Sequence, residues 1–198
     1  MTDETTTEIM DATYRALCEC GYAALRMQDI ADKTTKSTGT LHYHYDSKHD
    51  LLLAFLDHLY DQFVENKCAV EGETPDKQLI NLIDQWLAPS EDHTDRQFQT
   101  AILEIKSQAP YDEAYRQQLA RFDRAMADRI RKILANGIER GVFDPELDPD
   151  RTADLFVTMI NGAQTRHIAV NYSITATRTY LLDYIDVLAG TPPEVAAE

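Results

Sequence analysis

The chain has 198 residues, of which 43 % are hydrophobic, and its 34 acidic and 19 basic side chains give a formal net charge of −15. This length and apolar content suit one moderate domain, or a small domain joined to a larger one. Three cysteines are too few for a disulfide scaffold, and no apolar run reaches the ~18 residues that a membrane span needs. Taken alone, the negative charge also argues against a nucleic-acid partner.

The acidity has a distinctive composition, with 21 Asp and 13 Glu against 7 Lys and 12 Arg. Dense carboxylates with little lysine are typical of proteins that stay soluble in a salt-rich cytoplasm, so we expect a halophilic source. An ordinary acidic protein remains the alternative. The first residues show no basic segment followed by an apolar one, so we expect no signal peptide, a cytoplasmic location and no membrane partner.

The N-terminal third predicts four helices. Apolar residues from Ile9 to Cys20 recur on one face of a helix that Gly21 ends. A short helix follows over 27–33, then a polar turn, then a helix over 38–44 that Ser37 can cap. A longer fourth helix begins near residue 48 and carries apolar residues at helical spacing.

The rest of the chain predicts five longer helices, with apolar residues every three or four positions. They fall near 79–87, 98–109, 115–133, 155–163 and 181–188. Pro89 and Pro110 end two of them, and the stretch 141–149 forms a turn. Residues 191–198 are expected to be a frayed tail. With no convincing strand, the predicted fold is all-α with nine helices.

Several short motifs carry a resemblance to a known family. They are Gly21-Tyr22, Ile30-Ala31, Ser37-Thr38-Gly39-Thr40-Leu41-His42-Tyr43-His44-Tyr45, Ser47-Lys48 and Leu51-Leu52. Their order and spacing resemble the TetR family of transcriptional regulators. The resemblance implies a helix-turn-helix DNA-binding domain over 1–47 and a ligand-binding and dimerisation domain over 48–190. It also implies a homodimer, a palindromic double-stranded operator and a small effector. The stretch from Gly137 to Pro145 is similar to the choline-responsive branch.

Three places depart from the family pattern, one of which is His42, where the family usually has Tyr. The family usually has Ala-Gly-Val before the serine, where this chain has Thr34-Thr35-Lys36. Glycine there relieves a left-handed backbone, which would strain Thr35, so the turn is either rebuilt or costly. Lys36 replaces an apolar residue, so its head must reach solvent or a phosphate. Arg26 stands at a capping position and cannot accept the cap hydrogen bond, but it can meet a phosphate.

The predicted DNA contacts lie in and around the second and third helices, where small residues at the front of helix 38–44 let it enter the major groove. They are Arg26, Gln28, Lys36, Thr38, Gly39, Thr40, His42, Tyr43, His44 and Lys48. The window 26–49 holds four bases and three acids, so its net charge of +1 reverses the global sign. His42 and His44 lie on opposite helix faces and do not make a metal site, and we expect no cofactor.

Aromatic and sulfur-containing side chains in the later helices predict a cavity for a lipophilic effector. The candidate lining residues are Trp86, Phe98, Ile102, Tyr115, Phe122, Met126 and Met159, each of which could equally be plain core. Glu104 or Asp123 beside aromatic rings could favour a cationic lipophile. The last two helices have more apolar surface than one face needs, which predicts a dimer interface. Its residues are Leu155, Met159, Gly162, Ala163, Leu181, Tyr184, Ile185 and Leu188.

No hydrolase, zinc-protease, phosphate-loop or dinucleotide motif is present, so we do not expect an enzyme. The prediction is a ligand-responsive transcriptional regulator, most simply a repressor that its effector releases from DNA. The alternative is a helical ligand-binding or interaction protein whose degenerate turn no longer binds DNA. Arg26 and Lys36 discriminate, because a regulator should present both at one DNA-facing surface.

Overall fold

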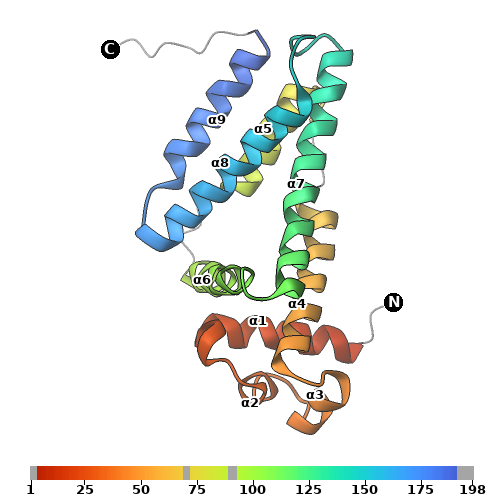
Figure 1. The fold of residues 1–198 in the computed structure, drawn as a ribbon, viewed down its shortest axis with the longest axis vertical. Coiled ribbons are helices and arrows are strands. Elements are labelled where there is room, and N and C mark those ends of the chain that lie inside the picture. The colour runs from red at the N-terminus through yellow and green to blue at the C-terminus, as the bar shows by residue number, and fades with distance from the viewer. Residues whose placement is uncertain (1–3, 69–71, 89–92, 191–198) are drawn as a thin grey trace. The chain divides into compact units, whose positions relative to one another are not determined.

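The computed structural model describes residues 4–68, 72–88 and 93–190, and the predicted tail at 191–198 lies outside them. Within those ranges every regular element is helical (Figure 1), which confirms the all-α prediction. None of the described helices is long and apolar enough to cross a membrane. The helices form two compact units, each with its own buried cluster.

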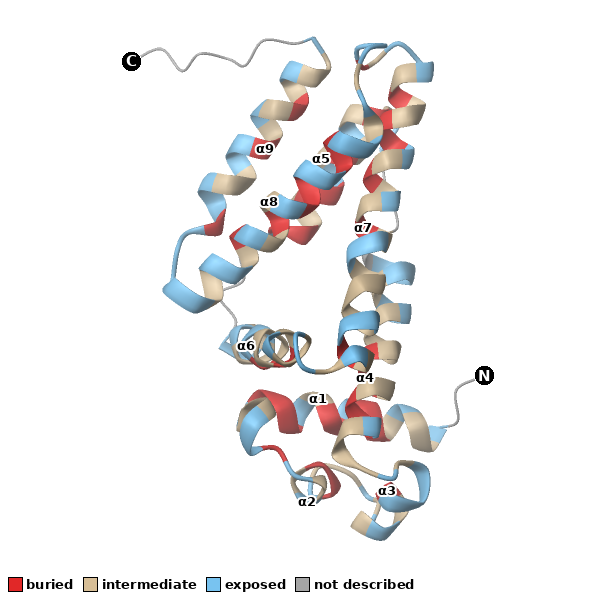
Figure 2. Cartoon of the chain, viewed as in Figure 1, coloured by how far each residue is buried: buried red, intermediate tan, exposed pale blue. Residues whose placement is uncertain are grey.

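The first unit combines the N-terminal helices with a later hairpin of the chain. It contains α1 (Glu4–Ala24), α2 (Met27–Ala31), α3 (Thr38–His44), α4 (Lys48–Gln62), α6 (His93–Gln108) and the first turns of α7 (Glu113–Glu139). α1 packs along α6 and also contacts α2 and α4. The buried side chains come from all of these helices, and each of α2 and α3 adds only one or two of them (Figure 2).

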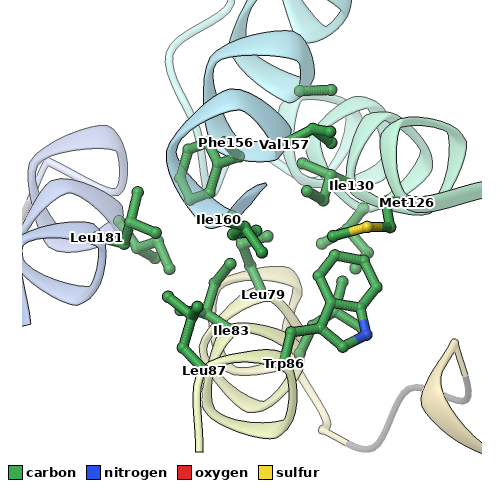
Figure 3. Close-up of a cluster of buried hydrophobic side chains, with 14 of the residues drawn as sticks. Leu79, Ile83, Trp86, Leu87, Met126, Ile130, Phe156, Val157, Ile160 and Leu181 are labelled. Carbon is green, nitrogen blue, oxygen red and sulfur yellow. The ribbon is translucent and has the colours of Figure 1, made fainter. Parts of the chain in front are cut away.

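The second unit contains a π-helical turn (Phe63–Lys67), α5 (Pro75–Trp86), the rest of α7, α8 (Pro149–Val170) and α9 (Ile174–Leu188). Its core is drawn in Figure 3, where α5, α7, α8 and α9 point aliphatic and aromatic side chains toward one another. Phe156, Ile160, Leu181 and Ile185 are all fully buried there. Burial of this kind contributes about 1.5–3 kcal/mol for each large side chain.

The two packed units do not coincide with the two functional domains that were predicted to meet at residue 47. α4, α6 and the start of α7 share a core with the helix-turn-helix segment, and α5 does not. Periodicity shows which face of a helix is apolar, but it does not show which partner covers that face. The division into a DNA-binding and a ligand-binding part therefore stays a prediction about function.

Candidate nucleic-acid interface and effector region

The predicted recognition helix is present where the sequence placed it. α3 spans Thr38–His44, and the side chain of Ser37 accepts a hydrogen bond from the Thr40 N–H at 3.1 Å, which confirms the predicted cap. Leu41 is its single buried residue and anchors it to the first core. The rest of α3 is exposed or half-buried (Figure 2).

Exposure separates the predicted α3 contacts into two groups. Gly39, His42, Tyr43 and His44 are exposed, and Tyr43 keeps 86 % of its surface free. Thr38 and Thr40 are half-buried, and their hydroxyls have partners nearby: the Thr38 hydroxyl donates to Gln28 Oε1 at 2.7 Å, and the Thr40 hydroxyl lies 3.1 Å from Ser37 Oγ. Contact of all these residues with DNA stays a prediction.

Gln28, a predicted DNA contact, also makes hydrogen bonds within the helix-turn-helix segment. It accepts from Thr38 of α3, and its own amide donates to Asp32 Oδ1 at 2.6 Å, so it connects the two helices. Arg26 precedes α2, with its side chain 80 % exposed and its guanidinium 3.4 Å from Asp29. Asp29 also accepts from the Arg26 backbone N–H at 2.8 Å, which completes one half of a capping box.

The turn before α3 is rebuilt rather than strained. Among the described residues other than glycine, only Asn171 has a positive φ, so Thr35 is not left-handed. Glu8 Oε1 accepts from the Thr34 hydroxyl at 2.6 Å, the Thr35 N–H at 2.8 Å and the Thr35 hydroxyl at 2.7 Å. Glu8 Oε2 lies 3.2 Å from Lys36 Nζ. These donors, the Thr34 hydroxyl foremost, lower the pKa of Glu8 to about 2.

This arrangement corrects the charge count of the sequence window. Arg26 pairs with Asp29 inside the window, whereas Lys33 pairs with Glu19 and Lys36 pairs with Glu8, both on α1. Counting these two carboxylates together with Arg15 of α1, whose guanidinium donates to the Lys33 carbonyl at 2.7 Å, changes the local net charge from +1 to 0. The region is then neutral rather than positive, and still less negative than the chain as a whole. Arg26 lies near Asp29 and Lys36 near Glu8, so neither base is without an acidic neighbour, and their common presentation to DNA stays a prediction.

Lys48 begins α4, and its ammonium group contacts another residue of the same chain. Its Nζ donates to the Tyr22 carbonyl at 3.1 Å and lies 4.9 Å from the centroid of the Tyr22 ring. The Tyr22 N–H in turn donates to Glu104 Oε2 of α6 at 2.6 Å, just after Gly21 breaks α1 with a φ of 67°. Glu104 thus supports the α1 break. Asp123, the other acid expected near a cationic effector, accepts from Asn161.

The predicted effector-binding residues fall into both units. Phe98, Ile102 and Tyr115 belong to the first core, where Phe98 contacts Tyr14 and Phe55. Trp86, Phe122 and Met126 belong to the second unit. There the Phe63 ring stacks on Trp86 at 5.9 Å and meets Phe122 at 5.6 Å. Sequence reasoning missed Phe63 as an effector candidate, because helical spacing made it one more core position of α4.

Met159 lies elsewhere, on the outer side of α8 and α9. With Leu155, Tyr180 and Tyr184 it lines an open hollow of about 500 Å³. Leu155 is 45 % and Tyr180 59 % exposed, so apolar surface is present on the predicted dimer face. Tyr180 was missed, although its position four residues before Tyr184 puts both on one helix face.

Three predicted interface residues are buried inside their own chain. Leu181 and Ile185 are fully buried and Ala163 is 6 % exposed, all within the core of one chain, so they have no surface to offer a partner. Figure 3 shows Leu181 pointing inward toward Ile160. Gly162 is exposed with no atom within 4 Å of a Cβ built on it, and Leu188 is half-buried. The surface candidates are therefore Leu155, Met159, Gly162, Tyr184 and Leu188.

Comparison with known proteins places the chain in a family. Residues 9–55 match the model described as bacterial regulatory proteins, tetR family, and residues 75–190 match BetI-type transcriptional repressor, C-terminal. A TetR transcription regulator from Haloarcula marismortui is 37 % identical with a TM-score of 0.85, and the match covers 93 % of this chain and 98 % of that one.

Two more distant proteins agree. The HTH-type transcriptional regulator TtgR of Pseudomonas putida is 25 % identical over 185 residues, which cover 86 % of this chain and 83 % of TtgR. A putative transcriptional regulator from Saccharomonospora viridis, solved in complex with choline, shares the fold at 22 % identity and a TM-score of 0.77, over 93 % of this chain and 97 % of that one. The chain belongs to the TetR family and is a DNA-binding transcriptional regulator, not an enzyme.

Proposed function

We propose that the protein is a cytoplasmic homodimeric repressor that reads a palindromic operator with α3 and leaves it when a lipophilic effector binds. The observation that carries the proposal is the exposed outer face of α3, on which Tyr43 is 86 % exposed while Leu41 alone is buried. A tyrosine offers a flat apolar ring and a hydroxyl that can donate and accept hydrogen bonds. On a helix that enters the major groove, such a side chain can contact a base edge or a sugar.

The DNA test uses a duplex selected by the wild-type protein from a randomised library in high salt. Tyr43→Ala should weaken binding to that duplex and relax its sequence preference. Arg26→Ala should weaken all duplexes about equally, because its exposed guanidinium suits a phosphate. Tyr111→Ala is the matched control, since Tyr111 is 91 % exposed between α6 and α7. Equal affinities of Tyr43→Ala and Tyr111→Ala for the selected duplex would contradict the assignment.

The dimer proposal rests on the apolar surface of α8 and α9. Leu155, Met159, Tyr180 and Tyr184 form a hollow that a second copy of the same helices would fill, because a two-fold axis brings identical patches together. Two-fold symmetry also explains why a palindromic operator suits the protein, since each half-site meets one α3. The −15 charge of each chain opposes association at low salt, so the assembly should be studied in high salt.

The effector proposal rests on the aromatic cluster of the second unit. Phe63, Trp86 and Phe122 put three rings together beside Met126, a composition suited to a flexible apolar ligand or to a quaternary ammonium group. The choline complex of the Saccharomonospora viridis protein supports testing the second class. The four other predicted lining residues, Phe98, Ile102, Tyr115 and Met159, are not needed for this proposal.

Trp86 is the single tryptophan of the chain, so its fluorescence reports on this cluster directly. Choline, palmitate and an acyl-CoA are suitable probes. A probe that lowers affinity for the selected duplex should also change the Trp86 emission, and Phe122→Trp should alter the response to that probe while operator affinity without probe stays nearly intact. A probe that releases DNA without affecting Trp86 would place the effector elsewhere.

We also propose that the protein works in a salt-rich cytoplasm. Its support is the composition, in which carboxylates outnumber bases by 34 to 19 and lysine is scarce. The measurement is the free energy of unfolding as a function of potassium chloride, which should rise well above physiological salt as carboxylate repulsion is screened.

A further inference from the structure

Glu8 makes an unusual set of contacts for an acid on the first helix. Four donors converge on its carboxylate, namely the hydroxyls of Thr34 and Thr35, the Thr35 N–H and the Lys36 ammonium. All four belong to three consecutive residues, 34–36, within the connection between α2 and α3. The acid and the turn are 26 to 28 positions apart in sequence, so the contact is a tertiary one.

Glu8 lies on α1, a helix that is packed into the first core. Its neighbours Ile9 and Met10 are 0 % and 2 % exposed in the first core, and α1 is packed along α6. The turn leads directly into the cap of α3, since Lys36 N–H donates to the Thr34 hydroxyl at 3.1 Å and Ser37 then caps the helix. Glu8 therefore contacts the segment that leads directly into the start of α3.

We propose that Glu8 is a positioning residue for DNA binding, because its carboxylate holds the connection between α2 and α3 in the form that presents the recognition helix. The proposal rests on the DNA-binding function argued above. Glu8 does this where the family usually has Ala-Gly-Val, a sequence whose side chains offer no hydrogen-bond donor to a distant acid. Without Glu8, the hydroxyls and N–H of the turn would have several alternative partners, so the turn would adopt several conformations in the free protein. DNA binding would then have to order the turn, which lowers the affinity for DNA.

A positioning role for Glu8 and simple electrostatic repulsion predict opposite effects of Glu8→Ala on DNA affinity. Removing any carboxylate near a polyanion lowers repulsion, so charge alone predicts that Glu8→Ala binds DNA more tightly. Positioning predicts that it binds more weakly. Asp11→Asn is the matched control for charge, because Asp11 is an exposed acid on the same helix and carries no contact to the turn.

The experiment measures fluorescence anisotropy of the selected duplex with wild-type protein, Glu8→Ala and Asp11→Asn at one salt concentration. We expect Glu8→Ala to lose about tenfold in affinity, which corresponds to about 1.4 kcal/mol. Asp11→Asn should bind as tightly as the wild-type protein or slightly more so. Glu8→Ala that binds at least as tightly as Asp11→Asn would overturn the proposal.

A rescue separates positioning from general damage to the fold. In a chain carrying Thr34→Ala, Thr35→Gly and Lys36→Val, the family's own turn is restored and Glu8 has lost three of its four partners. There Glu8→Ala should cost nothing in DNA affinity. An equal loss in both backgrounds would overturn the proposal, since Glu8 would then act through another part of the molecule.

Two further measurements cover the remaining outcomes. Hydrogen exchange at the Thr35 amide of free protein should accelerate in Glu8→Ala and not in Asp11→Asn, and unchanged exchange would also overturn the proposal. If Glu8→Ala proves unfolded by circular dichroism, Thr35→Val removes one donor hydroxyl while keeping the backbone N–H, and it should lose affinity in the same direction. Failure of the wild-type protein to select any duplex would instead overturn the DNA-binding function and the positioning role with it.

Discussion

Gly137, near the end of α7, is the position where one added carbon should do most harm. A Cβ there would lie 2.1 Å from Cδ2 and 2.4 Å from Cε2 of Phe143, well inside van der Waals contact. The Phe143 ring cannot easily move, because it is 3 % exposed and packed in the second core. The Val142 N–H donates to the Gly137 carbonyl at 2.8 Å, and Gly141 turns the chain with a φ of 68°, so the backbone is fixed as well.

The expected size of the effect follows from two opposing contributions. Alanine in a helix interior is favoured over glycine by about 1 kcal/mol. Overpacking a filled core costs about 1–3 kcal/mol, and complete expulsion of the ring would cost about 3–5 kcal/mol. Gly137→Ala should therefore lower the free energy of unfolding by up to about 2 kcal/mol if the core relaxes around the ring, and by about 2–4 kcal/mol if the ring is expelled, against the sign that helix propensity predicts.

Equilibrium unfolding in urea, followed through Trp86 in the same unit at one protein concentration, measures this change. Phe143→Ala supplies the matched background, because it removes the ring that the new Cβ would meet. In that background Gly137→Ala should be neutral or stabilising by up to about 1 kcal/mol. The reasoning is refuted if Gly137→Ala stabilises the wild-type protein, or if it costs the same with and without the Phe143 ring.

Three further outcomes are expected. Tyr180→Glu should give monomers in light scattering with unchanged circular dichroism, while Tyr111→Glu should leave the mass unaltered; a persistent Tyr180→Glu dimer would move the interface off α8 and α9. The log–log slope of DNA affinity against potassium chloride, from about 0.2 to 2 M, should be shallow or positive instead of the usual ~ −0.9 per phosphate, because carboxylates take up cations as phosphates approach; a steep negative slope for folded protein would exclude this. Since the pKa of Glu8 is lowered from 4.5 to about 2, its stabilisation is complete above pH 4.5 and lost toward pH 2; the difference in unfolding free energy between wild-type protein and Glu8→Gln should vanish over that range, and a constant difference would contradict the linkage.

Helix positions in this chain were predictable because the local signals agree with the tertiary structure. The Ser37 cap and the single apolar Leu41 define α3 without reference to any other helix. Gly21 breaks α1 as its sequence position suggests. The π-helical turn at Phe63–Lys67 had no such signal, since apolar spacing continues through it from α4.

Which helices pack against each other could not be predicted from the same signals. α9 has apolar residues on two sides, and spacing alone could not show that Leu181 faces the core while Tyr180 faces solvent. For α6 the sequence gives an apolar stripe, but only the structure shows that α1 covers it. The predicted effector set was divided between two cores for this reason, since aromatic residues on core faces look alike whichever core they join.

The turn between α2 and α3 shows how three unfavourable substitutions can be acceptable together. Thr34, Thr35 and Lys36 each look like a defect when compared with a turn built on glycine and apolar packing. Each also adds a hydrogen-bond donor, and Glu8 is placed to accept from all three. Buried or half-buried polar groups are stable when their partners are present and costly when one is removed. The substitutions and Glu8 therefore depend on one another, so we expect single changes among the four residues to harm DNA binding more than replacement of the whole turn.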